Sequence, residues 1–264
     1  MLLAATSARA GTLAEIPFEF RDGYLWVEVS VAGQHVPLHF LVDSGAAASV
    51  VSADAARRLD LRLGRPQVVQ GVGRQSTAFH VSHFDATVGG VALPRSVLAL
   101  DLRAVSATCH RPIDGLLGAD FFRSRVVRID FAAEKINILD RATAESGSVM
   151  LPMKLRNGAI CVPAMVAGRS SQWLRLDTGC DSALEWVVSD TRAQRGHETS
   201  VALTSAGKGA IRLDVQLGTR TMSGVKAGLY RRQLFLGEDG LLGNGLLGKF
   251  CVTVDFPGRR VILD

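Results

Sequence analysis

Apolar and polar residues alternate along short stretches of this chain, and glycine or proline separates the stretches. The pattern is clear in YLWVEVSVAG (24–33) and FHVSHFDATVGG (79–90), and it recurs in GAIRLDVQLG (209–218) and FCVTVDF (250–256). Such segments, rich in Val, Leu and Phe and bounded by turn residues, predict strands joined by tight turns. Two segments that each follow a predicted strand, 52–61 and 187–195, are expected to be short helices. The fold class expected is all-β, with one short helix in each half.

The same order of motifs occurs twice along the chain. HFLVDSG ends an apolar run at Asp43, and WLRLDTG does so at Asp177, 134 residues later. The phrase DGLLG follows at 114–118 and again at 239–243, each time 16 residues before an Asp-Phe pair. A lone Asp-Ser-Gly is usually only a turn. Its recurrence within the same order of motifs indicates instead that the chain is a duplicated unit.

The length fits two copies. A chain of 264 residues can form two domains of roughly 100 to 150 residues, each with a buried core. The small, polar stretch 141–148 suits a linker. We therefore expect an N-terminal lobe over 11–145 and a C-terminal lobe over 146–264.

Charge and hydropathy exclude two classes of partner. The formal charge of +5 comes from Arg and Lys scattered along both halves, without the basic stripe and interleaved aromatics of a nucleic-acid site. No run approaches the roughly 18 consecutive apolar residues of a membrane span. His80 and His83 would point to opposite faces of a strand, so we expect no metal site.

The cellular compartment is left open by the sequence. Ala8-Arg9-Ala10 fits the end of an export signal, which would place the protein in the periplasm or outside the cell. Residues 1–10 equally fit a disordered terminus of a cytoplasmic protein. The four cysteines are either paired or, on the simpler interpretation, buried thiols; they are Cys109, Cys161, Cys180 and Cys251.

These motifs together resemble the aspartic peptidases over about residues 15 to 264. Both halves are short, and LLGADFF and LLGNGLLGKF stand where the retropepsin-like bacterial branch has Leu-Leu-Gly and an aromatic or aliphatic pair. The resemblance implies two retropepsin-like β-barrel lobes related by a pseudo-twofold axis in a single chain. It also implies an enzyme without cofactors or metal that acts as a monomer on a peptide or protein substrate.

The resemblance assigns roles to the motif residues. Asp43 and Asp177 would be the catalytic pair; two carboxylates that face each other at close range share one proton and can supply both an acid and a base. Ser44 and Thr178 would brace the two loops, and Gly45 and Gly179 would let backbone amides approach the carboxylates. The support behind the loops would come from Leu116, Leu117, Gly118, Leu241, Leu242 and Gly243.

Flaps that cover a substrate are expected where the family places them, in glycine-bearing hairpins that begin 27 residues after each Asp. Glycine permits the backbone angles and the motion that a closing lid uses. The flap residues would be Gly71, Val72, Gly73, Ala206 and Gly207.

Three functional hypotheses remain from the sequence. The first is a single-chain aspartic endopeptidase in which the dyad activates water. The second is a catalytically silent peptide-binding module on the same fold. The third is an active site that forms between two chains, with the partner lobe supplied by the second chain.

Overall fold

The computed structural model describes residues 10–71, 74–188 and 210–264, and these residues are mostly strand. The strands of the first half are β1 (Thr12–Pro17), β2 (Glu19–Arg21), β3 (Tyr24–Val31), β4 (Leu38–Val42), β5 (Val50–Ser52), β6 (Leu63–Gly71), β7 (Arg74–Val81), β8 (Ala86–Val88), β9 (Val91–Ala92), β10 (Val97–Leu100), β11 (Gly115–Leu117), β12 (Val126–Asp130) and β13 (Lys135–Leu139). Those of the second half are β14 (Val149–Pro152), β15 (Lys154–Arg156), β16 (Ala159–Val166), β17 (Gln172–Leu176), β18 (Leu184–Val187), β19 (Ala210–Leu217), β20 (Arg220–Tyr230), β21 (Gly240–Leu242), β22 (Cys251–Asp255) and β23 (Arg260–Leu263). The helices are α1 (Ala53–Arg58), α2 (Arg103–Thr108), α3 (Ala119–Phe122) and α4 (Asn244–Leu247).

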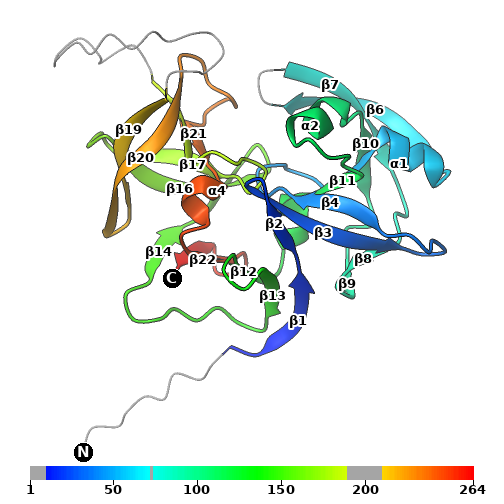
Figure 1. The fold of residues 1–264 in the computed structure, drawn as a ribbon, viewed down its shortest axis with the longest axis horizontal. Coiled ribbons are helices and arrows are strands. Elements are labelled where there is room, and N and C mark those ends of the chain that lie inside the picture. The colour runs from blue at the N-terminus through cyan, green and yellow to red at the C-terminus, as the bar shows by residue number, and fades with distance from the viewer. Residues whose placement is uncertain (1–9, 72–73, 189–209) are drawn as a thin grey trace, which may run out of the picture.

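The strands form two lobes that lie on opposite sides of the molecule (Figure 1). The first lobe is a ten-stranded sheet whose main path runs β6-β7-β10-β5-β11-β4-β3-β8-β9. The second lobe is a seven-stranded sheet, β15-β16-β17-β21-β18-β20-β19, in which β16 also pairs with β19 and closes a barrel. The expected two-lobe, all-β fold is confirmed.

Both lobes contain the same arrangement of four strands. In the first lobe β4 runs parallel to β11, β11 antiparallel to β5, and β5 parallel to β10. In the second lobe β17, β21, β18 and β20 repeat these relations in the same order. Each Asp of the repeated motif comes one residue after the first strand of this arrangement.

A third sheet joins the lobes. Its six strands follow the order β1-β13-β12-β22-β23-β14, so three strands of the first half continue into three strands of the second. The central pairing is antiparallel between β12 and β22, from Val126 opposite Asp255 to Asp130 opposite Cys251. These strands lie between and below the two lobes in the view of Figure 1. The main hydrophobic core is likewise continuous across both halves.

Strand β3 shows how the alternating pattern is used. Leu25, Val27 and Val29 face the main core, as the alternation predicts. On the opposite face, Tyr24 and Trp26 are also buried, in a second apolar cluster of the first lobe. The strand is therefore covered on both faces where it begins.

The described residues contain more helix than the sequence pattern predicted. Helix α1 forms inside the predicted segment 52–61, where the Ser52 hydroxyl accepts a 3.0 Å hydrogen bond from the Ala55 amide. Helices α2, α3 and α4 were not anticipated, because segments of four to six residues are too short to show a helical period. The helix expected at 187–195 can be assessed only at its first two residues, because residues 189–195 lie outside the described part of the chain. Val187 is the last residue of strand β18. None of the described helices is long and apolar enough to cross a membrane.

Candidate active site

Asp43 and Asp177 occupy equivalent positions at the ends of buried strands. Asp43 follows β4, and its amide donates to the Leu117 carbonyl at 2.9 Å. Asp177 follows β17, and its amide donates to the Leu242 carbonyl at the same distance. Each Asp is thus anchored by the Leu-Leu-Gly strand of its own lobe.

The two carboxyl groups meet between the lobes. A Cβ atom placed on Gly45 would lie 2.4 Å from the Asp177 carboxyl carbon, and one on Gly179 would lie 2.6 Å from that of Asp43. Each carboxyl therefore lies against the glycine of the opposite loop, where no side chain fits. The two carboxyl groups are close enough for each to affect the pKa of the other.

The two loops are tied by reciprocal hydrogen bonds. The Ser44 amide donates to the Thr178 hydroxyl at 2.9 Å, and the Thr178 amide donates to the Ser44 hydroxyl at 3.2 Å. Each hydroxyl then donates to the strand before the opposite loop, Ser44 to the Leu176 carbonyl at 2.8 Å and Thr178 to the Val42 carbonyl at 2.7 Å. Both residues are buried, and each hydroxyl group donates one hydrogen bond and accepts one.

Burial dominates the electrostatics of the pair. It raises the pKa of Asp177 to about 8, and the neighbouring Asp43 carboxyl adds to the rise. Burial also raises the pKa of Asp43, while the Ala46 amide, 2.9 Å from its Oδ1, acts in the opposite direction. The Gly179 amide donates to Asp177 Oδ1 at 3.0 Å. Two interacting carboxyls in such a place hold a shared proton across the neutral range and titrate as a pair.

The support residues lie directly behind the two loops. Leu116, Leu117, Leu241 and Leu242 belong to β11 and β21 and are buried. A Cβ on Gly118 would lie 2.4 Å from the Ala48 carbonyl carbon, and one on Gly243 would lie 2.3 Å from the Ser182 carbonyl oxygen. Close backbone packing therefore explains the glycine in both copies of Leu-Leu-Gly.

Only part of the expected flaps can be placed. Gly71 ends β6 and pairs with Arg74 at the start of β7, so the first candidate flap belongs to a β-hairpin. Val72, Gly73, Ala206 and Gly207 lie outside the described residues.

The other Asp residues of the repeated motifs each accept a hydrogen bond from a backbone amide, as expected for structural carboxylates. The donors are His39 for Asp114, Ala133 for Asp130, Trp173 for Asp239 and Gly258 for Asp255, at 2.8 to 3.0 Å. These four carboxylates shape turns and strand ends in both lobes.

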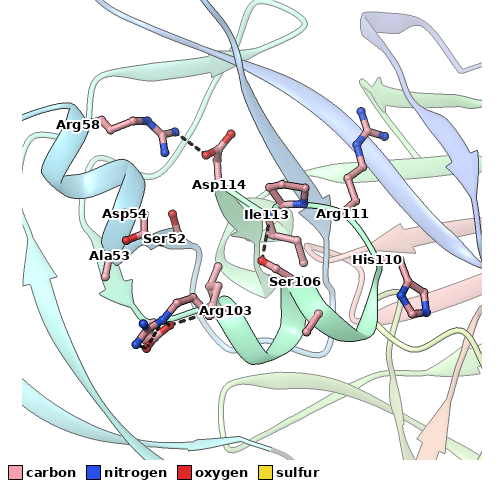
Figure 2. Close-up of a pocket in the computed structure, with 14 residues that line it drawn as sticks. Ser52, Ala53, Asp54, Arg58, Arg103, Ser106, His110, Arg111, Ile113 and Asp114 are labelled. Atoms are coloured by element: carbon pink, nitrogen blue, oxygen red, sulfur yellow. Dashed lines mark hydrogen bonds and ion pairs between the residues drawn. The ribbon is translucent and has the colours of Figure 1, made fainter.

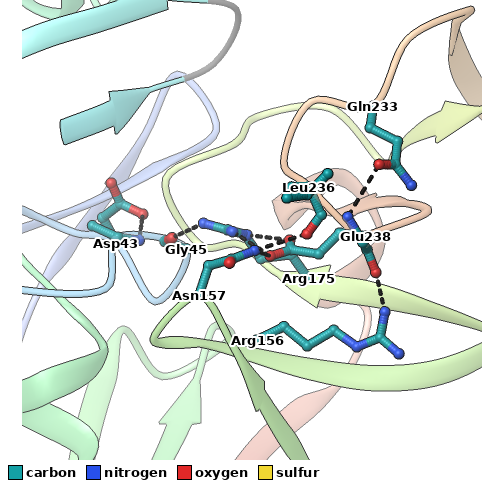
Figure 3. A network of polar contacts seen from close by, with 10 residues as sticks. Asp43, Gly45, Arg156, Asn157, Arg175, Gln233, Leu236 and Glu238 are labelled. Atoms are coloured by element: carbon teal, nitrogen blue, oxygen red, sulfur yellow. Dashed lines mark hydrogen bonds and ion pairs between the residues drawn. The ribbon is translucent and has the colours of Figure 1, made fainter. Parts of the chain in front are cut away.

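Sequence reasoning missed a buried ion pair next to the dyad. Arg175, two residues before Asp177, is 3% exposed and binds the Glu238 carboxylate in a two-pronged contact. The same guanidinium donates to the Gly45 carbonyl of the opposite loop (Figure 3). The available signal was Arg175 itself, a charged residue within the apolar run WLRLD where the first copy has Leu41.

A polar pocket lies elsewhere, between α1 and α2 of the first lobe (Figure 2). Its charged residues are largely satisfied by one another, with Arg58 on Asp114 at 2.6 Å and Arg103 on Asp101 at 2.5 Å. Neither Asp43 nor Asp177 lines this pocket. All four cysteines are free thiols.

Comparisons with known proteins agree with this geometry. Residues 27–121, which contain Asp43 and the first Leu-Leu-Gly, match a family described as aspartyl protease. No curated protein sequence matches the chain. Among solved structures, the chain is similar to the aspartic proteinase from Irpex lacteus, with 14% identity, 97% of each chain covered and a TM-score of 0.59. The chain thus has the two-lobe, pepsin-like and retropepsin-like fold of the aspartic peptidases, and most of its first lobe matches the aspartyl protease family.

Proposed function

We propose that this protein is an aspartic endopeptidase that hydrolyses peptide bonds with Asp43 and Asp177. The observation that carries the proposal is the meeting of two buried carboxyl groups, one from each lobe, each against the glycine of the opposite loop. A buried carboxyl pair with no catalytic use would be a cost to the fold, because each charge loses its hydration.

The proposed reaction uses the two protonation states of the pair. With one shared proton, the ionised carboxyl takes a proton from a water held between the two Asp residues. The protonated carboxyl donates to the carbonyl oxygen of the scissile bond as the water attacks its carbon. The raised pKa values favour this singly protonated state in mildly acidic and neutral solution. The reciprocal bonds of Ser44 and Thr178 hold the two loops at a fixed separation, which keeps the reacting groups in position.

The alternative is a peptide-binding module that keeps the fold without turnover. Both carboxylates and both loop hydroxyls are retained, and this favours the enzyme. We also propose that the monomer is the active form, because one chain supplies both carboxylates.

The test is cleavage of a mixed peptide library by the wild type, Asp43→Asn and Asp177→Asn. Both variants should lose cleavage while they keep the fold, because an amide can serve neither as the ionised base nor as the proton donor of the pair. The matched control is Asp130→Asn, which keeps an acceptor oxygen for the Ala133 amide and should leave cleavage intact. Activity above about a tenth of wild-type kcat in either dyad variant, less than roughly 1.4 kcal/mol of barrier, contradicts the paired mechanism.

Two further measurements separate the alternatives. A statine-type inhibitor should abolish cleavage by the wild type, whereas a silent binding module would show binding without cleavage at any pH. Sedimentation of the active enzyme should show a monomer, and activity found only in a dimer would favour a lobe supplied by a second chain.

A further inference from the structure

Each of the three guanidinium nitrogens of Arg175 donates a buried hydrogen bond. Nε and Nη2 donate to the two oxygens of Glu238 at 2.6 and 2.5 Å, and Nη1 donates to the Gly45 carbonyl at 2.6 Å. Gly45 belongs to the loop that carries Asp43, whereas Arg175 lies on the strand that leads to Asp177. One side chain of the second lobe therefore holds the catalytic loop of the first.

The guanidinium is itself held rigidly. Glu238 is 1% exposed and also accepts a 3.0 Å hydrogen bond from the Asn157 amide group. The Phe235 ring lies over Arg175, with its centroid 3.4 Å from the guanidinium carbon. Figure 3 shows the resulting chain of contacts from Glu238 through Arg175 to Gly45. A planar fork held along its edges by hydrogen bonds and on one face by an aromatic ring has little freedom to move.

The positions of the first lobe that correspond to Arg175 and Glu238 hold apolar residues. Leu41 stands two residues before Asp43 and pairs with Leu116, as Arg175 pairs with Leu241. Ile113 precedes Asp114, as Glu238 precedes Asp239. Leu41 and Ile113 are both buried in the apolar cluster of the first lobe.

The fold therefore accepts a hydrocarbon pair at this place. Buried ion pairs are often no more stabilising than well-packed apolar residues of similar volume. The need for Arg175 and Glu238 is better explained by what they contact than by the stability of the β-sheet.

The second effect of Arg175 is electrostatic. Its positive charge acts on both carboxyls of the dyad and opposes the effect of burial, which disfavours their ionised forms. Among the described residues, the other titratable groups next to the dyad or to Arg175 are acidic, thiol or phenol groups: Glu238, Asp181, Cys180, Cys109 and Tyr24.

We propose that Arg175, held by Glu238, is a positioning residue that fixes the Asp43 loop from the opposite lobe and supplies the positive charge that keeps one carboxyl of the dyad ionised. This inference rests on the proposed peptidase function for its kinetic readout. Arg175 is buried beneath the Asp43 loop and so is not placed to bind a substrate directly; its loss should act on kcat and on the pH profile more than on KM.

The decisive variant is the double substitution Arg175→Leu with Glu238→Ile, which copies the Leu41 and Ile113 pair and leaves no unpaired buried charge. We expect kcat to fall about tenfold with little change in KM, because the Gly45 loop loses its anchor. The variant removes a positive and a negative charge together, but of the two only Arg175 acts on both carboxyls. Both limbs of the kcat/KM profile should therefore move upward, by up to about one pH unit. Arg58→Leu, which removes an arginine from the Asp114 ion pair of the first lobe, is the control and should leave both quantities unchanged.

Two further arms keep the test decisive. Arg175→Lys keeps the charge but not the fork, so it should retain the wild-type pH profile and still lose kcat. Carbon-13 NMR titration of the Asp carboxyls, assigned with Asp43→Asn and Asp177→Asn, follows the dyad without any substrate.

A folded double variant with unchanged kcat and unchanged titration overturns the inference, and so does a lysine variant with full activity. If the wild type cleaves no peptide, the proposed function fails, and the NMR midpoint alone then decides whether Arg175 sets the protonation of the pair.

Discussion

The hydroxyl groups of Ser44 and Thr178 make reciprocal hydrogen bonds between the two lobes of the protein. Each accepts a hydrogen bond from the other residue's amide, and each donates to the strand that leads into the other residue's loop. Both residues are about 1% exposed, so no solvent can replace a lost bond. The two loops are consequently one hydrogen-bonded unit.

Removal of either hydroxyl should be costly. We expect Ser44→Ala and Thr178→Ala each to lower the free energy of unfolding by about 1 to 3 kcal/mol, because a buried amide and a buried carbonyl lose their partner. Cleavage should fall as well, since the separation of the carboxyls depends on these bonds. Thr178→Ser keeps the hydroxyl and serves as the control. Urea unfolding checks the prediction, and equal stability of the Ala and Ser variants at Thr178 contradicts it.

The carboxyl pair should make the protein less stable as the pH rises. Burial raises the pKa of both Asp43 and Asp177 above the unfolded value near 4, so the folded state binds protons more tightly than the unfolded state does. This stabilisation is fully present below about pH 4 and is lost as the pH rises through the folded pKa, about 8 for Asp177.

Asp177→Asn tests this linkage. The variant should be more stable than the wild type at pH 8, by at least about 1 kcal/mol or roughly 2 to 4 °C in Tm, and nearly equal to it at pH 3. Thermal unfolding across this pH range measures the difference. A wild type whose stability relative to the variant does not change with pH would show that the pair is not buried as described.

The residue three places after each Asp should set the acid limb of activity. Ala46 has no hydroxyl, and the Cys180 thiol lies 3.1 Å from the Ser182 hydroxyl. Neither side chain stabilises the ionised dyad, so we expect activity to peak at about pH 4 to 6. Ala46→Ser should move the acid limb downward where the new hydroxyl reaches Asp43, whose Oδ1 already accepts from the Ala46 amide at 2.9 Å. An optimum near pH 2 for the wild type would sink this argument.

Neither half of the chain should act alone. Fragments 1–145 and 146–264 each hold one motif Asp, and their separation removes the pairing of β12 with β22. We expect both fragments to be inactive in a cleavage assay, with some activity restored when they are mixed. Turnover by one isolated fragment, together with a dimeric size on gel filtration, would show that the other half is dispensable.

The two facing Asp residues and their loops could be located from the sequence because the motif that marks them is local. Asp, Ser or Thr, and Gly are consecutive residues, and the second copy distinguishes them from an ordinary turn. The strands were also visible, since alternation is a local signal. The duplication itself stays a prediction, although the two copies of the strand arrangement agree with it.

The ion pair could not be predicted in the same way. Arg175 and Glu238 are 63 residues apart, and their contact depends on how β17 and the segment before β21 fold together. Asn244 is a similar case, since its amide group donates at 2.7 Å to the carbonyls of Gly23 and Thr178, far from it in sequence. Such residues become visible only when the two copies are compared for the places where they differ.

The sheet shared by the lobes bears on how the protein is made. Strand β12 emerges from the ribosome long before β22, its neighbour in that sheet. Until residues 251–255 have been synthesised, β12 has an open edge, and open edges pair readily with other chains. Translation that stops between these strands would therefore yield chains with a tendency to aggregate. A chaperone that covers the open edge of β12 would be needed most while the second half is still being synthesised.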